Sequence, residues 1–328
     1  MKKLLSLAAA LFLFCAALPA LAAEVNVYTA VEPDVLIRYE RAFNKRHPDI
    51  KINWVRDSAG PITARLLAEK DDPRADVVFG TALNSILELA SYGIFQPYRS
   101  VNYDQINPEM RDNSPEPVWI GFNAWAASIC VNKKLLEAQK IAAPTSWEDL
   151  LRPEYRGKII MPNPASSSTG YMIIAGWIQG MGEEKAWAFM RELHKNIKMY
   201  VHSGSKPAQM AAQGEILVGI SSDAFASPYV KRGAPLLLVN PSDGVAWDME
   251  ASAILKGAKN LESAKKVIDF STSEAAAAIA VENLYIPARK VTGDNKVRSL
   301  KGMIPMNFKD AAARRSRVLE EWRSVFGQ

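Results

Sequence analysis

Three segments place small hydroxyl and glycine residues where helices are expected to begin: residues 57–60, 166–170 and 203–207. A helix start offers unpaired backbone N–H groups and about half a positive charge, and hydroxyls add hydrogen-bond donors without bulk. Three such starts directed at one cleft would bind a tetrahedral anion. The residues concerned are Ser58, then Ser167, Ser168, Thr169 and Gly170, then Ser203 and Ser205. Ordinary helix capping also uses serine and threonine, but one cap needs one side chain, so the four hydroxyls at 166–169 favour a ligand.

Acidic and aromatic residues near expected loop tips could hold an organic ammonium group, through charge and through cation–π attraction. They are Tyr28, Glu32, Asp223, Trp247, Asp248, Glu250 and Tyr285. Asp223 directly follows the expected strand 216–221 and opens a helix, which is where α/β folds place ligands. Asp223 can equally be a helix cap, and most exposed acids are merely solvated, so both interpretations stay open.

Signals for catalysis and for metals are weak. Ser203 and Lys206 match the S-x-x-K pattern of acyl-enzymes in which lysine activates serine, but no K-T-G follows, and no G-x-S-x-G occurs. The histidines at 47, 194 and 202 are far apart, and Cys130 is the only cysteine after residue 15, so zinc-type spacing is absent. We therefore expect no cofactor and no metal, and keep a secreted serine hydrolase using Ser203 and Lys206 as an alternative.

Composition places the chain among globular proteins. It has 328 residues, with 40 Lys+Arg against 35 Asp+Glu and a net charge of +5, and no basic block marks a nucleic-acid partner. Residues 1–22 read as a cleaved secretory signal, with Lys2 and Lys3 before an apolar run and a small-x-small site at 20–22. No later run approaches the roughly 20 apolar residues of a membrane span, so we expect soluble export.

The elements that must position these residues alternate between strand and helix patterns, which indicates an α/β fold with mostly parallel sheets. Expected strands cover 25–30, 50–55, 76–80, 158–161, 199–202, 216–221 and 235–239, and expected helices cover 33–45, 62–70, 83–92, 171–181, 183–194, 207–213, 225–231, 261–270, 274–282 and 311–325. Two longer strand-like segments, 119–132 and 245–255, suit crossings between two lobes. We assign lobe 1 to 23–123 plus 250–328 and lobe 2 to 124–249.

Several stretches resemble the periplasmic solute-binding proteins of ABC importers, in the branch that includes ferric-ion binders. They are Val27–Ala30, Ala75–Val78, Pro144–Leu150 and Tyr155–Lys158. The resemblance implies a type II periplasmic binding protein fold: two mixed, mostly parallel sheets flanked by helices, joined by two crossing strands and closing on a ligand. It also implies a non-enzymatic transport role, a permease partner and a monomeric protein.

Within that branch, residues 161–170, 202–207 and 247–251 look like those of 2-aminoethylphosphonate-binding proteins. In the ferric relatives a tandem tyrosine pair follows the strand that ends here near Ser222, whereas this chain has Asp223, Ala224 and Phe225. Glu32 corresponds to histidine-bearing loops of those relatives. Both differences disfavour iron and suit an amine, although a ferric or other anion binder of the same fold stays an alternative.

The resemblance implies specific roles for the candidate residues. Ser167, Ser168, Thr169 and Gly170 would hold the phosphonate from lobe 2, with Ser203 and Ser205 assisting and Ser58 reaching from lobe 1. Asp223 would bind the ammonium group, with Glu32 and Tyr28 as candidates across the cleft and Trp247 and Tyr285 beside it. These roles are predictions from the resemblance.

Overall fold

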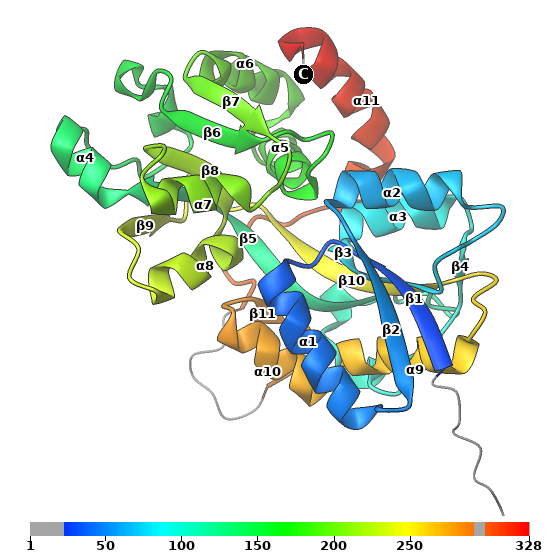
Figure 1. Cartoon of the computed structure of the whole chain (residues 1–328). Helices are drawn as coiled ribbons and strands as arrows, with labels where there is room; N and C mark the ends of the chain where they lie inside the picture. The colour runs from blue at the N-terminus through cyan, green and yellow to red at the C-terminus, as the bar shows by residue number, and fades with distance from the viewer. Residues whose placement is uncertain (1–22, 292–298, 328) are drawn as a thin grey trace, which may run out of the picture.

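The computed structural model describes residues 23–291 and 299–327. The expected signal segment, 1–22, lies outside the described residues. Two lobes, each a sheet with flanking helices, lie side by side and share a long central strand (Figure 1). The periplasmic binding protein fold expected from the sequence, with its mixed α/β sheets, is confirmed. The expectation of mostly parallel sheets is wrong, because six of the ten strand pairings among the described residues are antiparallel, most of them made by the two long segments expected to cross between the lobes.

Lobe 1 is built on three parallel strands and one antiparallel strand, in the order β2-β1-β3-β10. The strands are β1 (Ala23–Thr29), β2 (Ile50–Arg56), β3 (Val77–Ala82) and β10 (Trp247–Leu255), with the short β4 (Phe95–Gln96) on β10 and β11 (Ile286–Pro287) on β5. Helices α1 (Pro33–Arg46), α2 (Ala59–Ala68), α3 (Leu83–Ser91), α9 (Leu261–Ser271) and α10 (Glu274–Glu282) accompany them. Every residue of β3 is buried, as expected for a strand covered on both faces.

Lobe 2 repeats this plan, with the order β5-β8-β6-β7. Its strands are β5 (Ile120–Asn132), β6 (Ile159–Pro162), β7 (Ile197–Val201), β8 (Val218–Ser222) and β9 (Leu236–Val239). Its helices are α4 (Lys133–Gln139), α5 (Ser168–Met181), α6 (Glu183–His194), α7 (Lys206–Gln213) and α8 (Asp223–Lys231). The strands β6, β7 and β8 are parallel, while β5 and β9 run antiparallel to their partners.

The long strand β5 joins the two lobes. Its first half pairs with β10 in lobe 1 and its second half pairs with β8 in lobe 2. All of its 13 residues are buried, so the strand runs through the interior of both lobes. This matches the expectation that the segment 119–132 crosses between lobes.

Helix α1 shows how the sequence sets up one wall of the cleft between the lobes. Pro33 occupies its first turn, where a missing N–H costs nothing. Val35, Leu36, Tyr39 and Phe43 recur on one buried face, which is the amphipathic pattern of a helix packed on a sheet. The helix is thereby fixed with its N-terminal end, at Glu32, beside lobe 2.

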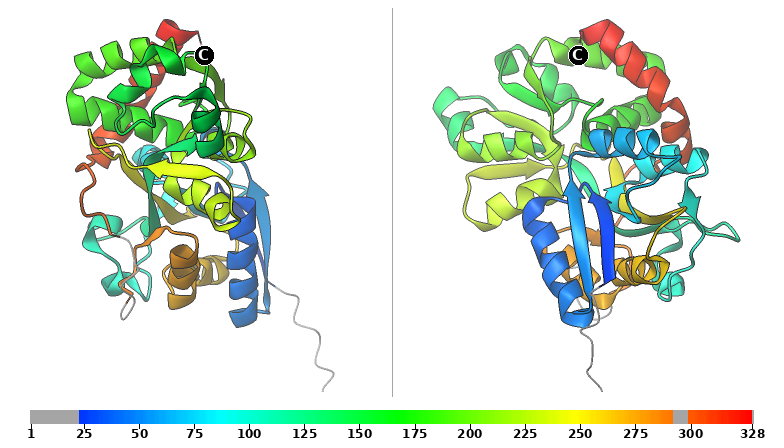
Figure 2. Two further views of the ribbon diagram at one scale, coloured as in Figure 1. Left: turned by 90° about the vertical axis from the view of Figure 1, so that its left-hand side faces the viewer. Right: turned by 45° about the vertical axis from the view of Figure 1, so that its right-hand side comes forward.

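The C-terminal helix α11 (Phe308–Phe326) corrects the expected division of the chain. Val318, Leu319, Trp322 and Phe326 belong to the apolar core of lobe 2, although 250–328 was assigned to lobe 1. The helix also reaches lobe 1, because Arg315 Nη1 lies 3.4 Å from Glu88 Oε2 on α3. Figure 2 shows α11 running from the outer end of lobe 2 toward lobe 1. Sequence order alone does not reveal which core a terminal amphipathic helix joins.

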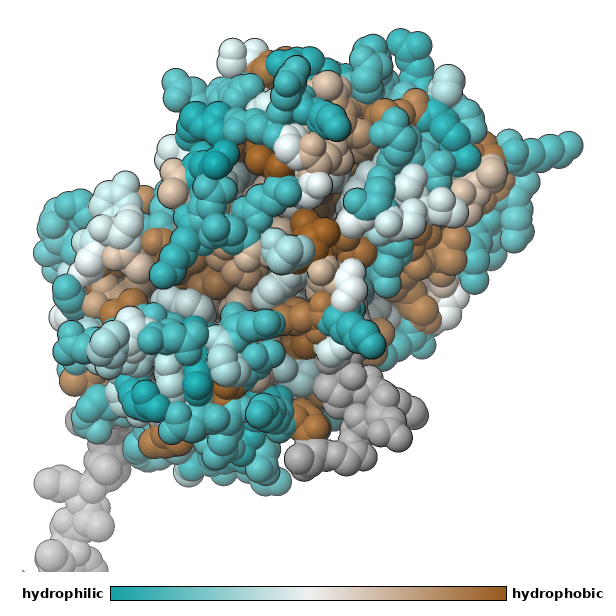
Figure 3. Space-filling view, turned by 180° about the vertical axis from the view of Figure 1, so that it is seen from behind, coloured by the Kyte–Doolittle hydropathy of each residue, from teal (hydrophilic) through white to brown (hydrophobic). Residues whose placement is uncertain are grey.

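Hydrophilic residues cover much of the rear face, and apolar ones show mainly in patches across its middle (Figure 3). Large apolar side chains such as Val101 and Tyr92 are exposed singly, which is ordinary for a globular protein. Within the described residues, no helix combines the length and apolar character needed to cross a membrane.

Candidate functional site

The three segments with helix-start hydroxyls come together between the lobes. The Gly60 N–H at the start of α2 donates to the Ser166 carbonyl at 3.2 Å. The Ser166 hydroxyl donates to the His202 carbonyl at 2.9 Å, and Gly204 lies so close to Thr169 that a Cβ there would be 2.2 Å from Oγ1. The starts of α2, α5 and α7 therefore meet in one place.

Most hydroxyls in these segments already serve local structure. Ser167 caps α5, since its Oγ accepts from Gly170 N at 3.3 Å. Gly170 leaves no room for a side chain, because a Cβ would lie 2.7 Å from the Pro162 carbonyl oxygen. The Ser203 and Ser205 hydroxyls pair at 2.8 Å. Thr169 is buried, whereas Ser58 and Ser168 are half-buried and the Ser58 side chain makes no capping bond.

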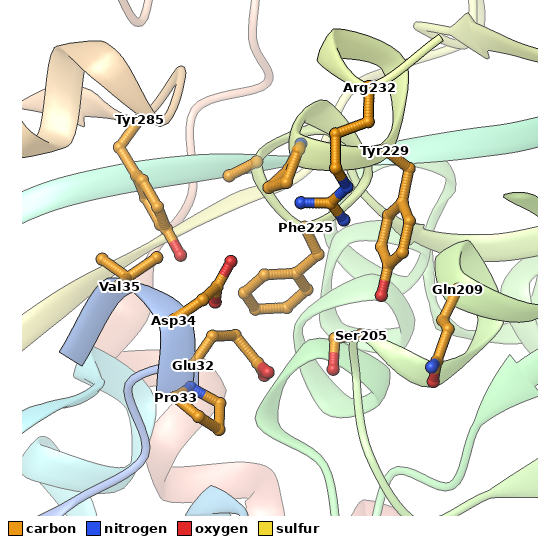
Figure 4. A pocket seen from close by; sticks show the side chains of 12 residues that line it. Glu32, Pro33, Asp34, Val35, Ser205, Gln209, Phe225, Tyr229, Arg232 and Tyr285 are labelled. Atoms are coloured by element: carbon orange, nitrogen blue, oxygen red, sulfur yellow. The ribbon is translucent and has the colours of Figure 1, made fainter. Parts of the chain in front are cut away.

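A cavity of about 290 Å³ lies beside this junction, between the lobes. Figure 4 shows its walls: Glu32 and Asp34 at the start of α1 on one side, and Ser205, Gln209, Tyr229 and Arg232 from lobe 2 on the other. The complete lining is Glu32, Pro33, Asp34, Val35, Ser205, Gln209, Ala224, Phe225, Pro228, Tyr229, Arg232 and Tyr285. Ser205 belongs both to this lining and to the start of α7, so the cavity adjoins the helix-start cluster.

Glu32 belongs to the lobe 1 wall of the cavity. It lies 3.3 Å from Arg56 Nη2, keeps 21% of its side chain exposed, and lines the cavity together with Ser205 of lobe 2. Burial raises the pKa of Glu32, while Arg56 and the Ser205 hydroxyl act in the opposite direction.

Charge is divided across the cavity. The carboxyl groups of Glu32 and Asp34 come from lobe 1, and the Arg232 guanidinium comes from lobe 2, where it lies 4.9 Å from the Tyr229 ring centre. Burial, together with the carboxylates of Glu250, Glu32 and Asp34, raises the pKa of Tyr285 well above its ordinary value. The Tyr285 hydroxyl is therefore a neutral hydrogen-bonding group. Such a cavity complements a ligand with a cationic end and an anionic end.

Glu32, Ser205 and Tyr285 are the sequence candidates that line the cavity. Three others have their polar atoms bound within the protein. The Tyr28 hydroxyl donates to Glu69 Oε2 at 2.8 Å, and Trp247 Nε1 donates to the Ile304 carbonyl at 3.1 Å. Asp223 Oδ1 accepts from the backbone N–H groups of Ala224 at 2.6 Å and Ala126 at 3.2 Å, whereas the residue that caps α8 is Ser222, whose Oγ accepts from Phe225 N.

Sequence reasoning missed five polar or aromatic lining residues: Asp34, Gln209, Phe225, Tyr229 and Arg232. A signal existed for the last three, because their spacing of four and then three residues places them on one face of α8. From the sequence, a helix face that lines a cavity cannot be distinguished from one that packs into the core. Aromatic residues at helical spacing more often belong to a core. Asp34 and Gln209 carried no comparable pattern.

The contacts give the hydrolase hypothesis no support. Lys206 Nζ donates to Gln209 Oε1 at 3.0 Å, and the Ser203 hydroxyl pairs with Ser205, whereas activation of serine would need the lysine amine within hydrogen-bond reach. In the part of the chain that the structure describes, no group of three or more His, Cys, Asp or Glu side chains could hold a metal ion.

The family model for bacterial extracellular solute-binding proteins matches residues 72–314. The chain belongs to this family. An uncharacterised protein of Haemophilus influenzae is 30% identical over 243 residues, covering 71% of this chain and 68% of that one. Iron uptake protein A1 of Synechocystis is 26% identical over 248 residues, covering 72% and 68% of the two chains.

Among solved structures, the periplasmic binding protein AfuA from Actinobacillus pleuropneumoniae, with fructose-6-phosphate bound, superposes with a TM-score of 0.87 at 28% identity. The match covers 93% of this solute-binding protein and 99% of AfuA. This chain is therefore a solute-binding protein of the ABC importer type, and the cavity between its lobes is its candidate ligand site.

Proposed function

We propose that this periplasmic solute-binding protein captures 2-aminoethylphosphonate, or a close aminophosphonate, and delivers it to an ABC permease. One observation carries the proposal: a cavity beside three helix starts has carboxyl groups on one wall and a guanidinium on the other. An aminophosphonate has the matching charges, an ammonium at one end and a phosphonate at the other.

The anionic end belongs beside lobe 2. The start of α7 offers backbone N–H groups and the Ser205 hydroxyl to a phosphonate oxygen, and Arg232 adds a charge-assisted donor in the same lining. AfuA, which has the same fold, holds a phosphate ester. A phosphate-type anion is therefore chemically compatible with this architecture.

The cationic end belongs beside lobe 1. Glu32 and Asp34 supply negative charge, and the rings of Phe225, Tyr229 and Tyr285 supply faces for cation–π attraction. Glu32 and Ser205, which both line the cavity, would then bind the two ends of one ligand. Asp223, expected to bind the ammonium, is replaced in this proposal by Glu32 and Asp34.

The test is calorimetric titration of the chain from residue 23 with 2-aminoethylphosphonate, ethylphosphonate, inorganic phosphate, fructose-6-phosphate and ferric citrate. Preferential binding of the aminophosphonate is expected. Equal binding of ethylphosphonate would remove the ammonium assignment, and preference for the sugar phosphate would reassign the ligand class. A coloured ferric complex without phosphonate binding would overturn the proposal in favour of iron.

Variants locate the ammonium group. Glu32→Gln and Asp34→Asn should each weaken 2-aminoethylphosphonate binding by about tenfold, because a charge-assisted hydrogen bond is worth about 1.5–3 kcal/mol. Ethylphosphonate binding should change much less. Glu24→Gln is the matched control, since it makes the same chemical change at the exposed Lys51 pair and should leave both affinities unchanged.

A further inference from the structure

A buried carboxyl group, Glu250, lies in the middle of the crossing strand β10. Its residue is 5% exposed, and its Oε2 accepts from Asn123 Nδ2 at 2.8 Å. Glu250 and Asn123 are directly paired in the sheet, and Asn123 also pairs with Pro287 of β11. Glu250 raises the pKa of Tyr285 through its charge, and Glu32 in turn acts on Glu250. Tyr285 and Glu32 both line the cavity whereas Glu250 does not, so Glu250 lies behind the cavity wall.

The groups around Glu250 leave its charge uncompensated. From α1 come the Tyr39 hydroxyl, which hydrogen-bonds Asn123, and the Glu32 carboxylate. On the side of β3, Glu250 faces Gly80, where an added Cβ would lie 3.7 Å from Glu250 Oε2. The Arg56 guanidinium pairs with Glu32. The Glu32 carboxylate repels a negative charge on Glu250.

This environment favours the neutral acid. Burial raises the pKa of Glu250 to about 8, with the Asn123 hydrogen bond lowering it and Glu32 raising it further. In the chain without ligand, Glu250 therefore keeps its proton at pH 7. A positive charge placed beside Glu32 and Tyr285 would favour the ionised form.

We propose that Glu250 is a proton-exchanging carboxyl beneath the ligand cavity: it loses its proton to solvent when an ammonium group occupies the cavity, and so makes cationic ligands bind more tightly as pH rises. The inference rests on the proposed function for its cationic ligand. No bond other than the O–H bond of Glu250 changes, and the released proton leaves to buffer. Glu250 acts as a positioning charge and does not itself need to touch the ligand.

Linkage sets the size of the effect. A ligand that lowers the pKa of Glu250 from about 8 to about 7 releases about half a proton per ligand at pH 7.5. The same change makes affinity rise about tenfold between pH 6 and pH 9. The ionisation of the ligand itself is common to every variant and cancels when affinities of two variants are compared at one pH.

The experiment compares the chain from residue 23 with its Glu250→Gln variant, by calorimetry at pH 6 and pH 9 with 2-aminoethylphosphonate. Equal affinities at pH 6 and an about tenfold advantage for glutamate at pH 9 are expected. Repetition in buffers of different ionisation enthalpy should show proton release with Glu250 and its loss with glutamine. An affinity ratio that does not change with pH would overturn the inference.

Asp248→Asn is the matched control, because Asp248 is a fully buried carboxyl on the same strand. Its oxygens accept from Leu83 N and Asn84 Nδ2 at the start of α3 and from Met249 N. The control should retain the pH-dependent advantage. Ethylphosphonate lacks the ammonium group. For this ligand, the ratio of the affinities of the unsubstituted chain and the Glu250→Gln variant should therefore not change with pH.

A ligand-free measurement separates this inference from the proposed function. Carbon-13 NMR of the glutamate carboxyl groups, with Glu250→Gln for assignment, should show one group that titrates near pH 8. If no phosphonate binds, the proposed function fails, while this titration still decides on Glu250. A Glu250 signal that titrates near the ordinary glutamate value would overturn the inference even if the ligand binds.

Discussion

The Tyr28 hydroxyl is used inside lobe 1. It donates to Glu69, and the Arg65 guanidinium, which also pairs with Glu69 at 2.9 Å, lies 4.6 Å from the Tyr28 ring centre. These three side chains fasten α2 to β1. The position of Tyr28 at a strand end led us to expect a contact with a ligand. Its hydroxyl and ring instead hold the neighbouring helix α2 in place.

Tyr28→Phe tests this structural role. The substitution should lower the free energy of unfolding by about 1–2 kcal/mol, because Glu69 loses a hydrogen bond to a charged acceptor in a partly buried place. Ligand affinity should change less than about twofold, since the ring remains. Chemical denaturation and calorimetry measure the two quantities. A large loss of affinity with unchanged stability would return Tyr28 to the binding site.

At the scale of elements, the start of α2 rests directly on the loop before α5. A Cβ on Gly60 would lie 2.6 Å from the Ala165 carbonyl oxygen and 2.9 Å from Ser166 Cα. Both are backbone atoms of the other lobe, which cannot move aside as a flexible side chain would. The glycine therefore permits the close approach of the lobes seen here.

Gly60→Ala should hold the lobes apart. We expect ligand affinity to fall by about tenfold or more, because overpacking of a fitted contact costs about 1–3 kcal/mol, and X-ray scattering should show a larger radius of gyration with ligand present. Stability of the lobes should hold, since alanine is the better helix former. The control Gly180→Ala, exposed on α5 with its nearest atom 3.9 Å away, should bind normally. Normal binding by Gly60→Ala would contradict this account.

The periodic patterns of apolar residues predicted most helices and strands well, because each pattern depends only on which residues of one element are buried. The expected helix 183–194 and the crossing 119–132 agree closely with α6 and β5. Helix α2 begins at Ala59 instead of the expected residue 62, because Pro61 is accepted in a first turn. Helix α4 was missed, being only seven residues long, too short for a clear period.

Site prediction depended on whether local sequence or tertiary contacts decide a side chain's role. Helix starts follow strands in the sequence, so their convergence could be predicted from the alternating pattern. The role of Asp223 could not, because it depends on the Ala126 N–H of β5, far away in the sequence. Arg232 was missed for a similar reason, since only the packing of the lobes makes its helix face a cavity wall.

At the scale of the whole molecule, two buried acids on β10 make stability depend on pH. Burial raises the pKa of Asp248 to about 7 and that of Glu250 to about 8, from ordinary values near 4 in an unfolded chain. Between pH 5 and pH 8 the folded chain therefore holds more protons than the unfolded chain, so stability must fall as pH rises. The carboxyls with lowered pKa, such as Glu69 and Asp149, stabilise fully above pH 5 and do not alter this slope. His47, whose pKa is lowered by burial, opposes it weakly.

We expect the free energy of unfolding to be several kcal/mol lower at pH 8 than at pH 5, because each pH unit over which one extra proton is held is worth about 1.4 kcal/mol. Denaturant unfolding without ligand at pH 5, 6.5 and 8 measures this. The Asp248→Asn, Glu250→Gln double variant should flatten the profile, since amides hold no titrating proton, while Glu24→Gln should leave the slope unchanged. Stability that rises over this range in the unsubstituted chain would mean that both acids are ionised in the folded protein, which would also remove the basis for proton release on ligand binding.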